Sequence, residues 1–209
     1  MSATKTKGAI PVSHYQQRQL EAYAANIAAQ KFDLTRHKCF ISYHAADTDE
    51  VVRFINDFGT EFIAKTVGVT DEDDFIDSEN SEYIMDQIRT KYLGDSTVTI
   101  VLIGKCTWSR RYVDWEVYSS LRDSKLSKIN GLLAIQLPSG KDSQLQARVG
   151  DNIERDEDGI DIGYARYNVY PDSKSTLRDL INDAYAARTS RRHLLNNRRS
   201  RRLNSASCP

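Results

Sequence analysis

The sequence predicts an α/β domain with an open, doubly wound parallel sheet of four or five strands. Segments rich in β-branched residues alternate with amphipathic segments along most of the chain, which is typical of parallel sheets covered by helices on both faces. The run 97–104, TVTIVLIG, is almost wholly apolar and ends in glycine, as expected of a buried central strand. At 209 residues the chain is long enough for one such domain with extensions, but not for two large domains.

The first part of the chain is expected to hold an N-terminal helix, the first strand and its crossover helix. Helix-forming residues fill 13–32, with Ser13 as a candidate N-cap. The run 37–44, HKCFISYH, turns abruptly apolar and is expected to form the first strand. In 47–65, apolar residues recur mainly at three- and four-residue spacing, and acidic residues gather at the start, where the helix dipole favours them.

The same alternation continues to residue 188. From residue 65 onward the expected elements are, in chain order, a weaker strand (65–69), an acidic loop (71–82), a helix (83–93), the central strand, a helix that contains Glu116, a strand (131–137), a polar loop (138–163), a short strand (166–170) and a helix (173–188). We divide the chain into an N-terminal extension, 1–36, the α/β domain, 37–188, and an arginine-rich tail, 189–209.

Composition limits the classes of protein to consider. No run approaches the roughly 20 apolar residues of a membrane-spanning helix, and the first residues lack the apolar centre of a signal peptide, so we expect a soluble, cytoplasmic protein without a membrane partner. The four histidines do not stand in metal-ligand spacing, and we expect no metal site. Cys39, Cys106 and Cys208 are widely spaced and do not favour a disulfide framework; Cys106 is expected to be a small buried side chain.

The C-terminal tail differs in charge from the rest of the chain. Residues 188–209 hold seven arginines and no acidic residue, whereas the rest carries 22 basic and 29 acidic residues. Arginines neutralise phosphates, but no aromatic residue stands between them to stack on bases, so nucleic-acid binding is not favoured. We expect either a solvated end or an arm that docks on the acidic body, and we expect the fold and the basal chemistry to survive deletion of residues 190–209.

Loops that follow parallel strands meet at one edge of the sheet, so three segments are expected to converge there. They are 43–47, the acidic stretch 74–82 and 106–116. The sequence has no glycine-rich phosphate loop and no GxSxG elbow, which argues against the usual kinases, dehydrogenases and serine hydrolases. A receiver-like phosphoacceptor domain would need an aspartate at the end of a strand, and no expected strand ends in one.

Two stretches carry a resemblance to a known family. Residues 39–55, CFISYHAADTDEVVRFI, and 96–121, STVTIVLIGKCTWSRRYVDWEVYSSL, resemble the TIR-like domain in the TIR proteins of bacterial Thoeris antiviral systems. In that family a strand ending in IG precedes a Ser/Thr-rich turn, an arginine pair, an aromatic residue and a catalytic glutamate, and Glu116 occupies the glutamate's position. The resemblance covers about residues 37–137 and implies a flavodoxin-like sheet; the acidic loop 71–82 departs from the family in charge.

The resemblance implies an enzyme that cleaves NAD at the nicotinamide–ribose bond and makes a cyclic or otherwise modified ADP-ribose signal. NAD would be the substrate, and no further cofactor is implied. A phage-derived trigger and self-association would activate the enzyme, and a separate effector protein would bind the signal. The alternative is a non-catalytic adaptor or nucleotide-sensing module that acts by protein assembly.

Glu116 suits this chemistry by a physical argument that does not need the family. Nicotinamide leaves as a neutral molecule while positive charge develops on the ribose, and a nearby carboxylate stabilises that charge. Glu116 lies near the expected helix start and borders the apolar stripe of the helix, so its side chain can lean over the sheet edge. The alternative is a solvated charge that only favours the helix dipole.

The other candidates are assigned to substrate binding, and most of them have a structural alternative. Trp115 would form a wall of the pocket, and Arg110 or Arg111 would meet the pyrophosphate, although both arginines could instead pair with Asp114.

Five further candidates come from segments at the same edge. Ser42, Tyr43 and His44 stand at the end of the first strand, and Tyr43 and His44 could instead pack at the sheet edge. Asp77 and Ser81 belong to the acidic segment and could instead be turn or cap residues.

Overall fold

The computed structural model of the chain describes residues 36–67, 93–123 and 128–208. Its sheet has five strands in the order β2-β1-β3-β4-β5, and every neighbouring pair runs parallel. The strands are β1 (Lys38–Ser42), β2 (Ile63–Val67), β3 (Val98–Ile103), β4 (Gly131–Gln136) and β5 (Arg166–Asn168). This order confirms the predicted α/β class with a doubly wound, flavodoxin-like parallel sheet.

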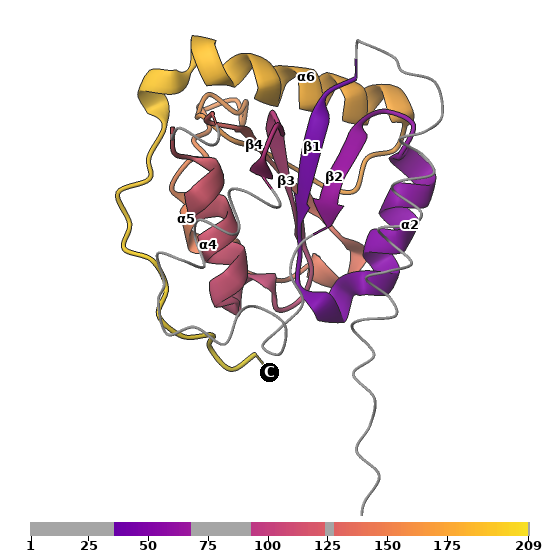
Figure 1. The fold of residues 1–209 in the computed structure, drawn as a ribbon, viewed down its shortest axis with the longest axis vertical. Helices are drawn as coiled ribbons and strands as arrows, with labels where there is room; N and C mark the ends of the chain where they lie inside the picture. The colour runs from indigo at the N-terminus through magenta and orange to yellow at the C-terminus, as the bar shows by residue number, and fades with distance from the viewer. Residues whose placement is uncertain (1–35, 68–92, 124–127, 209) are drawn as a thin grey trace, which may run out of the picture.

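Helices cover both faces of the sheet (Figure 1). The described α-helices are α2 (Thr48–Phe58), α4 (Arg111–Ser120), α5 (Ala147–Gly150) and α6 (Lys174–Ser190). Short 3-10 turns form η1 (Ala45–Asp47), η3 (Thr107–Ser109), η4 (Pro138–Gly140) and η5 (Arg192–Leu194). In the described part of the chain, no helix combines the length and apolar character that crossing a membrane requires.

Two apolar cores hold the layers together. Phe54 of α2 and Ile181 of α6 pack with one set of strand side chains, while Val117 of α4 packs with the opposite set. All six residues of β3 are buried, and this strand pairs with both β1 and β4. The run TVTIVLIG therefore forms the central strand, as predicted, and burial of its two faces explains why it lacks alternating polar residues.

Several boundaries differ from the sequence prediction. The helix expected over 47–65 ends at Phe58, because Gly59 and Thr60 turn the chain into β2. Phe62 matched the helical spacing, but it is buried just before β2 and contributes to the same core. The second strand lies two residues earlier than expected. The loop 138–163 contains η4 and α5, which are too short to produce a periodic pattern.

Other expected elements cannot be compared with the structure. The N-terminal helix and the acidic loop lie outside the described residues, and so does the helix over 83–93 apart from its last residue. The final helix begins at Lys174, close to the expected start, with Ser173 as its cap, and continues to Ser190, so the first residues assigned to the tail belong to α6.

Candidate active site

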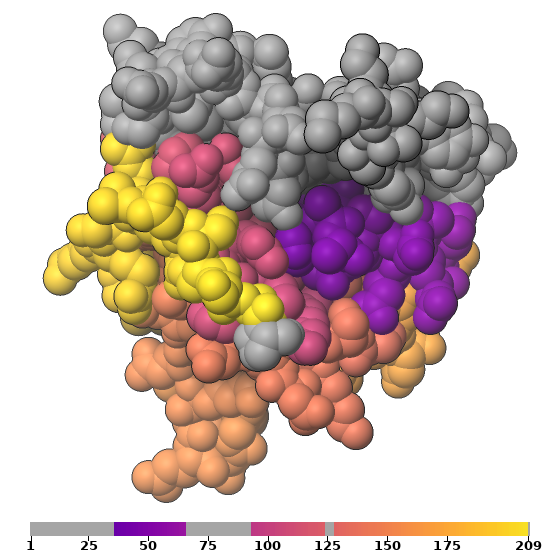
Figure 2. Space-filling model, turned by 90° about the horizontal axis from the view of Figure 1, so that it is seen from below, coloured from indigo at the N-terminus to yellow at the C-terminus, as the bar shows by residue number. Residues whose placement is uncertain are grey.

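The carboxyl ends of β1 and β3 form the edge at which the candidate residues meet. The chain changes direction across the sheet between these strands, and ligands of open α/β sheets bind at such switch points. The loops after them approach closely: a Cβ added to Gly104 would lie 2.1 Å from Oδ2 of Asp47, so only glycine allows this contact. Figure 2 faces this edge, where the indigo segment around β1 adjoins the magenta segment after β3.

Glu116 is buried at this edge and bonded to the end of β1. Its exposed fraction is 1%, and that of Ser42 is 0%. The Ser42 hydroxyl donates a hydrogen bond to Glu116 Oε2 over 2.5 Å, joining α4 to a strand 74 residues earlier in the chain. The interpretation of Glu116 as a solvated surface charge is therefore wrong. A buried carboxylate loses hydration and needs such donors, so its presence here calls for a reason beyond solubility.

Asp47 is a second buried carboxyl at the edge, and the sequence analysis did not assign it a site role. Its position before α2 suits an N-cap, yet its side chain makes no cap hydrogen bond. Instead the Thr107 hydroxyl donates to Asp47 Oδ2 over 3.2 Å, and Gly104 N donates to the same hydroxyl over 2.9 Å. Burial raises the pKa of the Asp47 carboxyl above its ordinary value, while the nearby His44 and the Thr107 hydrogen bond oppose this shift.

The raised pKa of Asp47 predicts a pH dependence of stability. Because the folded state binds the proton more tightly than the unfolded chain, Asp47 favours folding at low pH. That contribution is lost as the pH rises from the ordinary aspartate pKa through the raised folded value. Asp47→Asn keeps an acceptor for Thr107 but cannot ionise. Urea unfolding from pH 4 to 7 should therefore show the parent losing stability relative to the variant; a relative gain by the parent would refute the assignment.

Three other predicted residues lie near the same loops. Tyr43 is 2% exposed and belongs to the apolar core on the α2 side. It therefore packs against the sheet, which was the structural alternative to a role in substrate binding. His44 is buried beside Asp47, and its carbonyl accepts a hydrogen bond from Asp47 N. Arg110 lies close enough to lower the pKa of Asp47, and its Nε is buried without a hydrogen-bond partner among the described residues. Arg110 thus keeps hydrogen-bonding capacity near the Asp47 carboxyl.

Arg111 and Trp115 make contacts that the sequence did not indicate. Trp115 donates its indole N–H to the carbonyl of Arg202 over 2.7 Å, and the backbone N–H of Arg111 donates to Ser205. The Arg111 guanidinium lies over the rings of Tyr112 and Trp115, 4.8 and 5.5 Å from their centroids. Both residues therefore help to hold the tail, and a role in substrate binding stays a prediction.

The two remaining candidates cannot be placed. Asp77 and Ser81 lie outside the described residues, so their assignment to substrate binding also stays a prediction.

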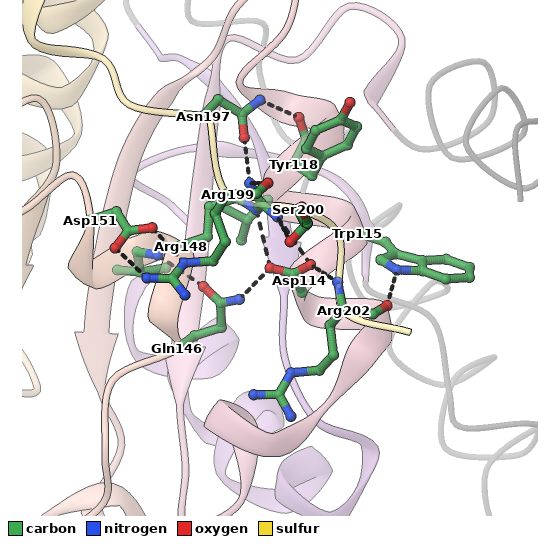
Figure 3. Close-up of polar contacts among 12 residues, drawn as sticks. Asp114, Trp115, Tyr118, Gln146, Arg148, Asp151, Asn197, Arg199, Ser200 and Arg202 are labelled. Carbon is green, nitrogen blue, oxygen red and sulfur yellow. Dashed lines mark hydrogen bonds and ion pairs between the residues drawn. The ribbon is translucent and has the colours of Figure 1, made fainter. Parts of the chain in front are cut away.

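A buried ion pair fixes the outer side of α4 (Figure 3). Arg148 of α5, which is wholly buried, donates from Nε and Nη2 to the two carboxylate oxygens of Asp114 over 3.1 and 3.2 Å. Gln146 and the backbone N–H of Arg202 also donate to Asp114. Asp114 therefore pairs with Arg148 rather than with Arg110 or Arg111. The remaining guanidinium donors reach acceptors in the tail: Asn197 Oδ1, Arg199 O and Ser200 O.

The arginine-rich tail is a docked arm, which was the second of the two expected alternatives. It runs along α4 and η3: Asn197 donates to the Tyr118 carbonyl of α4, and Ala206 N donates to the Ser109 carbonyl of η3. Arg199 forms a two-pronged ion pair with Asp151, both distances being 2.6 Å. These contacts seal the buried pair between Asp114 and Arg148. They indicate that deleting residues 190–209 would cost stability, while survival of the fold after that deletion stays a prediction.

The end of the tail is bonded covalently to the loop after β3. Cys106 and Cys208 form a disulfide across 102 residues of sequence, and Figure 2 shows the yellow tail reaching the magenta loop. The expectation that Cys106 is a small buried side chain outside any disulfide is wrong, whereas Cys39 is buried and unpaired. Sequence spacing could not reveal the bond, because pairing requires the tail to fold back over α4.

We expect reduction of this disulfide to destabilise the protein by about 2 to 4 kcal/mol, since the bond closes a long loop in the unfolded chain. The thermal midpoint of the parent should fall on addition of dithiothreitol. Cys208→Ser should have a low midpoint that dithiothreitol does not change. Non-reducing digestion should also yield a linked peptide containing both cysteines. Equal midpoints for parent and variant without reductant would argue against the bond.

Comparison with known proteins supports the family indicated by this geometry. The family model of the Thoeris protein ThsB, TIR-like domain, matches residues 40–142, a segment that includes Ser42, Asp47 and Glu116. No curated protein matches the chain. The parallel sheet and its helices agree with a TIR-like fold. Residues 40–142 of the chain therefore form a TIR-like domain of the Thoeris ThsB type.

Proposed function

We propose that this protein cleaves the nicotinamide–ribose bond of NAD and thereby produces an ADP-ribose-derived signal in antiphage defence. The observation that carries the proposal is the buried Glu116 carboxylate, held by Ser42 at the β1/β3 switch point. Burying a carboxylate costs several kcal/mol, because its charge is removed from water, and a catalytic role is one reason for a protein to bear that cost. The family match adds the defence context, since Thoeris is an antiviral system.

In the proposed reaction the bond between ribose C1′ and the pyridinium nitrogen breaks. Its electron pair stays on the nitrogen, so nicotinamide leaves as a neutral molecule and needs no general acid. Positive charge develops on C1′ and the ring oxygen, and the Glu116 carboxylate stabilises it. Attack on C1′ by water gives ADP-ribose and one proton. Attack by a nitrogen or hydroxyl of the same ADP-ribosyl group gives a cyclic product, again with loss of one proton.

The surrounding residues have roles that follow from their contacts. Ser42 holds one oxygen of the carboxylate, so the charge is oriented before the substrate arrives. Arg110 lies near Asp47 at the same edge, and its planar guanidinium suits a pyrophosphate. We further propose that a phage-derived trigger and self-association activate the enzyme, and that a separate effector protein binds the product.

The test is to incubate the purified full-length protein with NAD and identify the products by mass. One arm contains lysate from phage-infected cells, and the control arm contains lysate from uninfected cells. We expect nicotinamide together with ADP-ribose or a cyclic isomer in the infected arm. If NAD stays intact in both arms, the protein is better explained as a non-catalytic module that acts by assembly.

A further inference from the structure

A second pocket opens beside the candidate active site, over the ends of β3 and β4. Its volume is about 490 Å³, which lies within the range of roughly 300 to 1,000 Å³ typical of small-molecule sites. Its walls are the loop after β3, the loop after β4 and the last residues of the tail. The two loops are held together, because Leu137 N donates to the Ile103 carbonyl over 2.9 Å. The pocket is therefore formed by well-packed elements at the edge where α/β proteins bind ligands.

The polar groups in the walls indicate an anionic ligand. Lys105 and Lys141 bring two ammonium groups, and neither pairs with a carboxylate among the described residues. Asp142 is the single acidic residue lining the pocket, so the net charge of the walls is positive. Ser139 and Ser143 add polar residues to the same lining.

An aromatic side chain completes the lining. Trp108 is partly exposed and stands in the wall beside Lys105, so a planar ring can pack against the indole. Cationic groups together with a stacking surface suit a molecule that carries both phosphates and a heterocyclic base. We propose that this pocket binds a nucleoside diphosphate group, with the diphosphate on the two lysines and the base on Trp108.

The nucleoside diphosphate group could come from two sources. Both are considered because the loop after β3 borders the pocket as well as the candidate active site. Thr107, which bonds Asp47, stands between Lys105 and Trp108 in the sequence. The group is therefore either the ADP half of NAD, whose nicotinamide end would lie near Glu116, or a separate nucleotide that binds beside the substrate. The first source rests on the proposed function, whereas nucleotide binding by the pocket does not.

The test is a calorimetric titration of the full-length protein with ADP, which requires no turnover. We expect Lys105→Ala, Lys141→Ala and Trp108→Ala each to weaken ADP binding about tenfold or more, since each removes a direct contact. Added salt should weaken binding by the parent, because the contacts with phosphate are ionic. Lys128→Ala is the matched control, since it removes one lysine from a different surface and should leave the affinity unchanged. Equal thermal midpoints would show that the variants are folded.

A competition arm distinguishes the two sources. In Glu116→Gln, excess NAD should displace ADP if the pocket holds the ADP half of NAD, whereas ADP should still bind if a separate nucleotide occupies it. Either result supports the pocket as a nucleotide site. The proposal is overturned if millimolar ADP does not bind, or if the three pocket variants bind it as the parent does. Because ADP binding is measured without NAD cleavage, a negative result here is distinct from a failure of the proposed enzyme activity.

Discussion

Glu116→Gln is expected to lower NAD turnover by about a hundredfold to a thousandfold while NAD still binds. Glutamine keeps the size of the side chain and an oxygen that can accept the Ser42 hydrogen bond, but it removes the negative charge. Losing a preorganised electrostatic contact of this kind typically costs about 3 to 4 kcal/mol in the transition state. The ground state carries no such developing charge, so the loss should appear in kcat rather than in the affinity for NAD.

The control for this variant is Glu157→Gln, which removes a charge from an exposed position. It should leave turnover unchanged. NAD binding by Glu116→Gln can be measured calorimetrically because the variant consumes little substrate. If Glu116→Gln turns over NAD at the rate of the parent, Glu116 is a structural residue and the catalytic assignment fails. If it loses both binding and its thermal transition, the residue's main role is in the fold.

Asp114→Ala should destabilise the protein by about 3 to 5 kcal/mol, the cost of leaving a buried charge without its partner. Arg148 is wholly buried, and Asp114 supplies both oxygens that accept from its Nε and Nη2. At the size of this chain that cost corresponds to a fall of about 6 to 20 °C in the thermal midpoint. Asp142→Ala, an exposed aspartate, is the matched control and should change the midpoint little.

The docked tail should change how much stability is lost when Asp114 is removed. With the tail in place, Arg148 is covered by Asn197, Arg199 and Ser200 and cannot reach water. A protein that ends at Ser190 should be less stable than the parent, because it loses these contacts and the disulfide. In that shorter protein, however, Asp114→Ala should cost less, since water can solvate the exposed guanidinium. Urea unfolding of the four proteins in this cycle measures the difference, and equal costs with and without the tail would contradict the sealing role.

The features that sequence predicted well are those set by local composition. An unbroken apolar run identified β3 as the central strand, since a strand buried on both faces has no polar alternation. The placement of Ser42 and Glu116 at one edge followed from the rule that loops after parallel strands share that edge. Glu116 was also marked by its motif, but its burial could not be read from the sequence. Helical periodicity only placed it at the border of the apolar stripe.

The features that sequence missed depend on contacts between distant segments. Arg148 stands in a polar loop and would ordinarily be exposed, but a carboxylate 34 residues earlier and the tail 49 or more residues later bury it. Asp47 suits a helix cap by position, yet its side chain turns to Thr107 across the sheet edge. The disulfide likewise exists only because the tail folds back over α4. No local pattern encodes these pairings.

Release of nicotinamide tests the proposed activity most directly, because hydrolysis and cyclisation both break the same bond. The measurement is a time course of nicotinamide formed from NAD by the parent and by Glu116→Gln, each activated with the same lysate from infected cells. Heated lysate without protein serves as the blank. We expect one nicotinamide for every NAD consumed by the parent, and a rate at least about a hundredfold lower for the variant. Equal rates, or no nicotinamide from the activated parent, would contradict the assignment of Glu116 as the residue that stabilises the ribose cation.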